Sequence, residues 1–205
     1  MNVALWKRML LKSAYLLKSN IKYLCELDSI AGDGDHGITI GRIGECIEER
    51  ISNNYENDSI KKINDDLSLK LMNVNGGSAG PLYGTIFEGM SEGIEDKEIL
   101  IIKDIKNMFK ESKEAFQMIS KAKLGDKTLV DAFYPAVDAI VDSEGTLLEM
   151  LEAGVKASEE GAKNTKNYIA KFGRAKNVGE RSIGHKDPGA VSISLFFKGL
   201  YEGAK

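Results

Sequence analysis

Residues 31–37 read AGDGDHG, and the six residues from Gly32 to Gly37 match the dinucleotide-binding pattern G-x-G-x-x-G. That pattern indicates an α/β fold only where a strand precedes it, because its glycines shape a strand-to-helix turn. Here the preceding apolar residues recur with the spacing of one helix face: Val3, Trp6, Leu10, Leu17, Ile21 and Leu24. Asp33 and Asp35 would also repel a pyrophosphate unless cations intervened. The match is therefore accidental, and the stretch favours a helical fold.

Helical spacing dominates the rest of the chain. The first helix is expected to run without a break up to Asp28, which falls on its apolar face. Later helices are expected around residues 40–47, over 59–73, from Pro81 as first residue, over 98–120, after Thr128, over 145–172 and from Pro188, with Asp187 as N-cap. Two stretches, EILIIKDI (98–105) and VSISLFF (191–197), could be strands, and we interpret both as helix.

About eight helices with short connections predict an all-α bundle of antiparallel helices, in a single domain over residues 1–205. In that arrangement every second helix begins at the same end. The glycine-rich loops AGDGDHG, NGGSAGP, LGDKT and HKDPG precede those four helices. Their N-termini would therefore surround one mouth, where unpaired N–H groups suit a phosphate.

Composition excludes several classes of function. Acidic and basic residues alternate along a chain of net charge −3, so no basic face for nucleic acid is evident. No apolar run approaches 18 residues, and we expect no membrane span. Cys25 and Cys46 form no C-x-x-C pair, which is typical of free thiols in a reducing cytoplasm.

Asp28, Asp33 and Asp35 offer three hard oxygen ligands within eight residues, which suits Mg²⁺ with nucleotide phosphates. An EF-hand is excluded because Gly44 falls at its twelfth position, and a Walker A loop because no Gly-Lys pair occurs. The alternative is that these aspartates only form turns and caps. Likewise His36 is either a phosphate donor or a capping or core histidine.

Four stretches occur in order at wide spacing: LDSIAGDGDHG (27–37), GGSAGPLYGTIF (76–87), GDKTLVDAFYPAVDAI (125–140) and GRAKNVGERSIGHKDPGA (173–190). Together they resemble the nucleotide-binding L subunit of dihydroxyacetone kinases, which is the C-terminal domain of fused enzymes. The resemblance covers the chain from about Leu27 to its end. Two departures are Ser78-Ala79, where the family has Ala-Ser, and the composition of residues 175–179.

The resemblance implies a closed barrel of eight antiparallel helices with a nucleotide at one mouth. It implies two Mg²⁺ ions held by Asp28, Asp33 and Asp35. The nucleotide-binding residues that it implies are His36, Gly37, Ile38, Thr39, Gly77, Ser78, Ser120, Thr128, Leu129, Arg174, Asp187, Pro188 and Gly189. Leu129 would line the base pocket, and Arg174 would close over the nucleotide.

The resemblance also implies partners. A K subunit would hold dihydroxyacetone, and a phosphocarrier M subunit would recharge retained ADP with phosphate from phosphoenolpyruvate. No general base need lie in this chain, because phosphoryl transfer depends on positioning and charge neutralisation. The alternatives are an ATP-dependent kinase subunit for dihydroxyacetone or a related ketose or polyol, and a nucleotide-sensing docking module. A metal-dependent phosphohydrolase would have only His36 and His185 as candidate bases.

Overall fold

The computed structural model describes residues 1–53 and 58–205, and the regular structure in these ranges is helical. The helices are α1 Val3–Ser19, α2 Ile21–Asp28, α3 His36–Ser52, α4 Ile60–Met72, α5 Ala79–Glu92, α6 Ile102–Ile119, α7 Val130–Asp142, α8 Leu147–Asn164 and α9 Pro188–Ala204. Two 3₁₀ segments, η1 (Thr165–Asn167) and η2 (Arg174–Ser182), lie between α8 and α9. Within the described ranges, no helix has both the length and the apolar character needed to cross a membrane.

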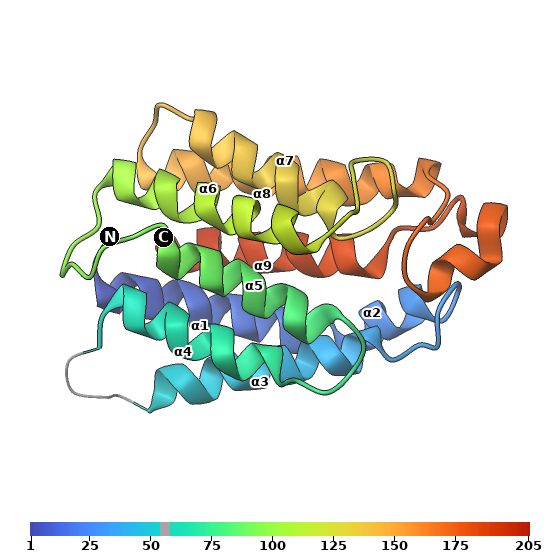
Figure 1. Cartoon of the computed structure of the whole chain (residues 1–205), viewed down its shortest axis with the longest axis horizontal. Helices are drawn as coiled ribbons and strands as arrows, with labels where there is room; N and C mark the ends of the chain where they lie inside the picture. The colour runs from blue at the N-terminus through green and yellow to red at the C-terminus, as the bar shows by residue number, and fades with distance from the viewer. Residues whose placement is uncertain (54–57) are drawn as a thin grey trace.

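The helices close into a ring around one apolar core (Figure 1). Each of α3, α5 and α7 packs between its neighbours, and α9 packs against both α8 and α1. Because α1 and α2 follow each other as one kinked rod, eight rods make up the ring in the described part of the chain. This confirms the expected all-α closed bundle of about eight antiparallel helices. The loop between α2 and α3 and segment η2 lie at the end of the bundle away from the two termini, which we call the mouth (Figure 1).

The expectation of one unbroken first helix is wrong, because Asn20 interrupts it. α1 ends at Ser19 and α2 begins at Ile21. The Asn20 side chain donates from Nδ2 to the carbonyl of Leu16 at 2.8 Å, and its backbone N–H donates to Leu17 at 3.3 Å. Such local bonds compete with the regular helical ladder and bend the rod at this point.

Two other helices do not begin where expected: α5 begins earlier and α6 begins later. α5 begins at Ala79, so Pro81 is its third residue and not its first. A proline is still tolerated there, because the N–H groups of the first turn have no partner within the helix. α6 begins only at Ile102, since residues 98–101 run alongside the N-terminus, where Ile99 forms an isolated antiparallel bridge. Only the second half of the EILIIKDI stretch is therefore helical.

The start of α9 is as predicted, and the end of α8 is not. The Asp187 carboxylate caps α9 by accepting the N–H of Ala190 at 2.7 Å, and Pro188 is the first helical residue. The expected continuation of α8 to Phe172 is wrong, because the helix ends at Asn164. Residues 165–187 instead leave the bundle and return to it. We call them the lid segment.

Close contact between α9 and α1 completes the ring. A Cβ added at Gly203 would lie 2.5 Å from the Met9 Cα, and one at Gly199 would collide with Ser13. The Ser13 hydroxyl donates to the carbonyl of Phe196 at 2.9 Å across the same interface. Small residues thus let the backbones of α9 and α1 approach each other and close the ring.

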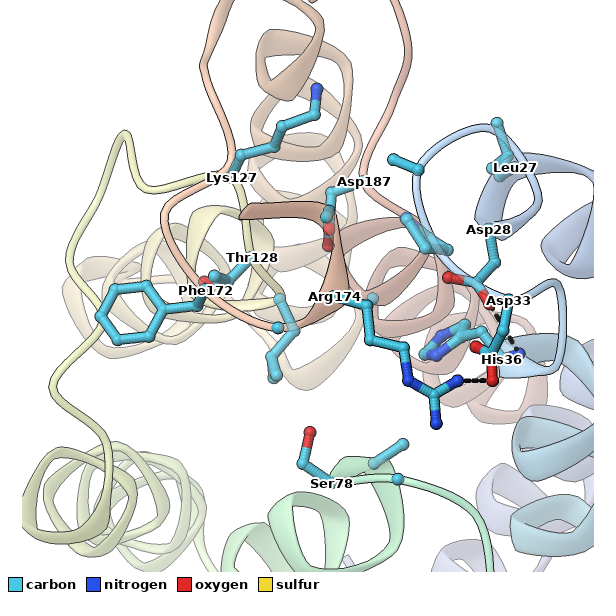
Figure 2. Close-up of a pocket in the computed structure, with 18 of the residues that line it drawn as sticks. Leu27, Asp28, Asp33, His36, Ser78, Lys127, Thr128, Phe172, Arg174 and Asp187 are labelled. Carbon is cyan, nitrogen blue, oxygen red and sulfur yellow. Dashed lines mark hydrogen bonds and ion pairs between the residues drawn. The ribbon is translucent and has the colours of Figure 1, made fainter. Parts of the chain in front are cut away.

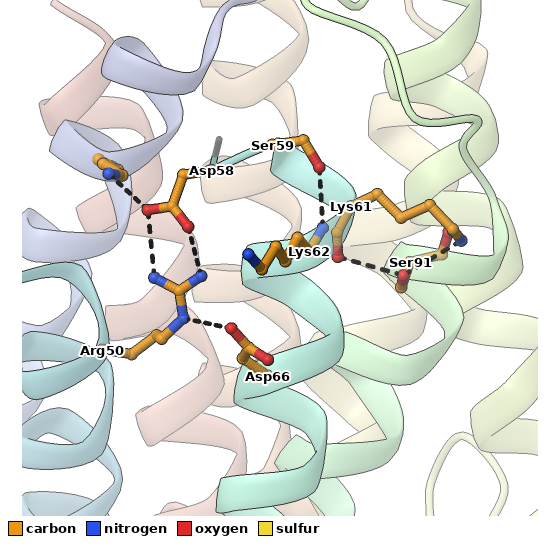
Figure 3. A network of polar contacts seen from close by, with 8 residues as sticks. Arg50, Asp58, Ser59, Lys61, Lys62, Asp66 and Ser91 are labelled. Carbon is orange, nitrogen blue, oxygen red and sulfur yellow. Dashed lines mark hydrogen bonds and ion pairs between the residues drawn. The ribbon is translucent and has the colours of Figure 1, made fainter. Parts of the chain in front are cut away.

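The opposite end of the bundle is held by a buried ionic network (Figure 3). Arg50 of α3 is only 1% exposed and donates to Asp58 from Nη2 at 2.7 Å and from Nη1 at 3.3 Å. Its Nε donates to Asp66 of α4 at 2.7 Å. Lys7 of α1 pairs with the same Asp58 at 2.7 Å. One carboxylate therefore joins two helices and the start of a third.

Candidate functional site

The carboxylate of Asp28 organises the loop that follows α2. Its Oδ2 accepts the backbone N–H groups of Asp35 at 3.0 Å and His36 at 3.2 Å. These N–H groups stand at the start of α3, where no helical partner is available. A Cβ at Gly32 would collide with the same carboxylate, so the loop folds closely around it. The acid on the apolar face of the first helix is thus compensated by backbone donors.

Asp28, Asp33 and Asp35 each place one carboxylate oxygen within 4.8 Å of the others. Three such oxygens fit Mg²⁺, which takes a few carboxylates and completes its shell with water or phosphate. Arg174 of the lid segment pairs with Asp33 and lies 3.9 Å from Asp35 (Figure 2). The Arg174 guanidinium thus offsets part of this negative charge, and the three carboxylates together are a donor set that suits a hard divalent cation.

His36 is partly buried beside the aspartates, with Nε2 3.3 Å from the hydroxyl of Ser192 on α9. Burial lowers the pKa of His36 to about 4, although the Asp28 carboxylate and the Pro188 carbonyl act in the opposite direction. The imidazole is therefore neutral near pH 7. It can offer a hydrogen bond to a ligand, but not a positive charge.

The glycine-rich loop before α5 forms a second wall. Gly76 and Gly77 have φ values of +126° and +58°, which favour glycine. A Cβ at Gly76 would collide with the Thr39 side chain, so this loop lies directly against the first turn of α3. Ser78 makes no side-chain capping bond to α5, and its hydroxyl points into the cavity (Figure 2). A free hydroxyl and bare backbone thus face the same space as the aspartates.

The far wall is built by the starts of α7 and α9 and by the lid segment. Thr128, Leu129 and Phe172 line it, the last from the lid segment (Figure 2). Asp187 at the start of α9 is partly buried, and desolvation raises its pKa to about 7 against the hydrogen bond from Ala190. The cavity has a volume of about 390 Å³ and is partly open to solvent. It is bounded by the starts of α3, α5, α7 and α9, and helix N-termini of this kind favour a negatively charged ligand.

Most residues expected at the site line this cavity: Asp28, Asp33, Asp35, His36, Thr39, Gly77, Ser78, Thr128, Leu129, Arg174, Asp187, Pro188 and Gly189. Ser120 lies instead in a separate surface groove with Gln117 and Tyr134. Gly37 packs against α2, and the side chain of Ile38 is 48% exposed outside the cavity. Ligand contacts remain predictions for all of these residues.

Sequence reasoning missed several residues of the cavity wall, and Lys127 and Phe172 are the most informative of them. Lys127 lies between Asp126 and Thr128 in the turn before α7, where the sequence predicts only a turn and a helix start. Phe172 is predicted on a helix face, but it lies in the lid segment. A lysine inside a glycine-containing turn at the expected mouth was an available signal. The position of Phe172 depended on where α8 ends, which the periodic pattern did not show.

Comparisons with known proteins agree with this geometry. The DAK2 domain family matches residues 30–202. The chain is 32% identical over 193 residues to the "PEP-dependent dihydroxyacetone kinase, ADP-binding subunit DhaL" of Escherichia coli (strain K12), covering 93% of this chain and 91% of the relative. It is 35% identical over 187 residues to the "PTS-dependent dihydroxyacetone kinase, ADP-binding subunit DhaL" of Lactococcus lactis subsp. lactis (strain IL1403), covering 91% and 90%.

A solved structure shares the fold. The dihydroxyacetone kinase of C. freundii in complex with AMP-PNP and Mg²⁺ aligns with a TM-score of 0.71 and 23% sequence identity. The alignment covers 98% of this chain and 34% of the solved chain, so the present chain corresponds to about a third of that enzyme.

Proposed function

The chain belongs to the DAK2 domain family, and on that premise we propose that it is the ADP- and magnesium-binding subunit of a phosphoenolpyruvate-dependent dihydroxyacetone kinase. In this proposal residues 1–205 form one nucleotide-binding domain. A separate K subunit holds dihydroxyacetone, and a phosphocarrier M subunit recharges the retained ADP. We also propose that the protein is cytoplasmic, because the free thiols of Cys25 and Cys46 suit a reducing compartment.

The observation that carries the proposal is the cluster of Asp28, Asp33 and Asp35 beside the cavity. These three carboxylates would hold two Mg²⁺ ions, which neutralise phosphate charge when bound. Around them the chain supplies neutral donors and helix starts. That combination suits a nucleotide polyphosphate better than an uncharged ligand.

The chain's own residues would position the phosphates. The backbone of Gly77 and the Ser78 hydroxyl lie on one side of the cavity, and Arg174 reaches in from the lid segment. A guanidinium can pair with the transferring phosphoryl group and stabilise its charge. His36, being neutral, would donate a hydrogen bond. The acceptor hydroxyl and its activation would come from the partner subunit.

The purified chain alone should phosphorylate nothing, because the acceptor is held by another polypeptide in this proposal. Mixing the chain with a K subunit and a phosphocarrier charged from phosphoenolpyruvate should give dihydroxyacetone phosphate. Turnover by the chain with ATP and dihydroxyacetone alone would overturn the subunit assignment. Turnover with the K subunit and ATP, without the phosphocarrier, would favour the ATP-dependent alternative.

Replacing Arg174 with glutamine should weaken ADP binding by roughly 10- to 100-fold, because charge-assisted hydrogen bonds to phosphate contribute about 1.5–3 kcal/mol. Titration calorimetry in excess Mg²⁺ measures this. The matched control is Arg181→Gln, which changes an exposed arginine of the same η2 segment that lies outside the cavity lining. Equal affinities of the two variants would remove Arg174 from the proposed phosphate site.

A further inference from the structure

Lys127 occupies an unusual position for a lysine. Its side chain lines the cavity, yet the residue is only 5% exposed. Among the non-glycine residues in the described ranges, it alone has a positive φ, at +58°. Lysines are rarely buried, and a left-handed backbone is unfavourable for them. A lysine with a positive φ persists only where the surrounding structure holds it, so the contacts of Lys127 indicate its role.

The ammonium group of Lys127 binds both ends of the lid segment. It donates to the carbonyl of Thr165 at 2.5 Å and to that of His185 at 2.5 Å. Thr165 follows the last residue of α8, and His185 precedes the start of α9. Figure 2 shows the side chain running away from Arg174 and Ser78. The charge of Lys127 is therefore directed at the base of the lid segment and not at the phosphate side of the cavity.

Other hydrogen bonds pair the two ends of the lid segment with each other. The N–H of Gly184 donates to the carbonyl of Lys166 at 2.7 Å, and the N–H of Asp187 donates to the Thr165 hydroxyl at 2.9 Å. These bonds close the segment into a loop with a narrow base. Lys127 lies at that base and connects it to the turn before α7.

A second link holds the flank of the lid segment to the same turn. The backbone N–H of Lys171 donates to the carbonyl of Asp126 at 3.1 Å, and its ammonium pairs with the Asp126 carboxylate at 2.7 Å. Lys171 is largely exposed, whereas the Lys127 ammonium is enclosed. A buried charged donor contributes more than an exposed ion pair, because loss of the donor leaves the buried carbonyl of Thr165 unsatisfied.

We propose that Lys127 is a positioning residue that fastens both ends of the lid segment to the bundle and thereby slows nucleotide release. The nucleotide part rests on the proposed function, whereas the fastening is a property of the chain itself. Without the ammonium, the base of the lid segment can separate from the α7 turn. Arg174 and Phe172, which the segment carries into the cavity, would then leave it more often.

Hydrogen exchange tests the fastening directly. In the full chain without nucleotide, Lys127→Met should make the amides of Gly184 and Asp187 exchange at least about tenfold faster, with α3 and α5 unchanged. The matched control is Lys163→Met, which removes an exposed lysine from the last turn of α8. Unchanged exchange at Gly184 and Asp187 would overturn the proposal. Lys127→Asn provides a second variant that folds readily, because asparagine tolerates a left-handed backbone.

The rate of nucleotide release tests the second part of the proposal, that Lys127 slows the dissociation of ADP. ADP bound with Mg²⁺ should dissociate at least about tenfold faster from Lys127→Met than from Lys163→Met in stopped-flow displacement. Faster exchange in the lid segment with unchanged ADP release would refute the role in retention. If the unmodified chain bound no ADP, the retention half would fall with the proposed function. Exchange at Gly184 would still decide whether Lys127 fastens the segment.

Discussion

Replacing Asp33 with alanine should abolish nucleotide retention by the purified chain. The change removes one of three carboxylates whose oxygens lie within 4.8 Å of one another. Mg²⁺ depends on such oxygens, and the remaining Asp28 and Asp35 would have to hold it with more water ligands. Because the phosphates would in turn bind through the metal in the proposed site, we expect Mg²⁺-dependent ADP affinity to fall by at least about 100-fold.

The nucleotide content of the variant, measured by anion exchange after denaturation, checks this expectation. Asp96→Asn is the control, since it changes an exposed acid in the turn after α5, remote from the cavity. Both proteins should unfold at similar denaturant concentrations, because Asp33 is exposed and not part of the core. An unchanged nucleotide content in Asp33→Ala would refute the metal assignment and would leave the turn-forming interpretation of the aspartates.

Replacing Arg50 with methionine should lower the free energy of unfolding by about 3 kcal/mol, the low end of the usual cost of breaking a buried ion pair, because Lys7 still pairs with Asp58. Asp58 is 4% exposed in its side chain and accepts two hydrogen bonds from Arg50. In the variant, the Asp58 carboxylate would keep Lys7 but lose its bidentate partner (Figure 3). The links from α3 to Asp58 and Asp66 would both be lost.

Urea unfolding at pH 7 measures this effect, with Lys110→Met as a control that removes only an exposed i,i+4 pair. Burial alone would raise the pKa of Asp58, but hydrogen bonds from Arg50 and Lys7 outweigh it and the pKa is lowered. A lowered pKa of Asp58 stabilises the folded state at pH values above the unfolded-state pKa of about 3.9. This stabilisation is lost as the pH falls through the lower pKa of Asp58 in the folded state. The loss on acidification should therefore be smaller in Arg50→Met. Equal stability of Arg50→Met and the control would show that the network is dispensable.

The sequence predicted the fold because its main determinant is periodic. Apolar residues at helical spacing gave the number of helices, and short connections gave the antiparallel order. The positions at which helices are interrupted or end were harder to predict. Asn20 interrupts the first helix through two local hydrogen bonds, and apolar spacing continues across it unchanged. The end of α8 was misplaced for the same reason, since small and aromatic residues up to Phe172 keep a helical pattern.

The candidate site was predictable where chemistry is concentrated in short stretches. Three clustered aspartates and a glycine-rich loop are visible in the sequence, and the structure brings both to one cavity. The role of Lys127 was not visible, because it depends on two backbone carbonyls 38 and 58 residues further along the chain. Ser120 shows the converse: a hydroxyl near the expected mouth lies in a different groove.

The measurement that tests the central claim most directly is the nucleotide content of the chain as purified without added nucleotide. The account predicts about one ADP per chain, released when Mg²⁺ is chelated or the fold is lost. Chelation should empty the site because the three aspartates bind the phosphates only through the metal. A chain that purifies empty, and that binds neither ADP nor ATP in the presence of Mg²⁺, would contradict the account.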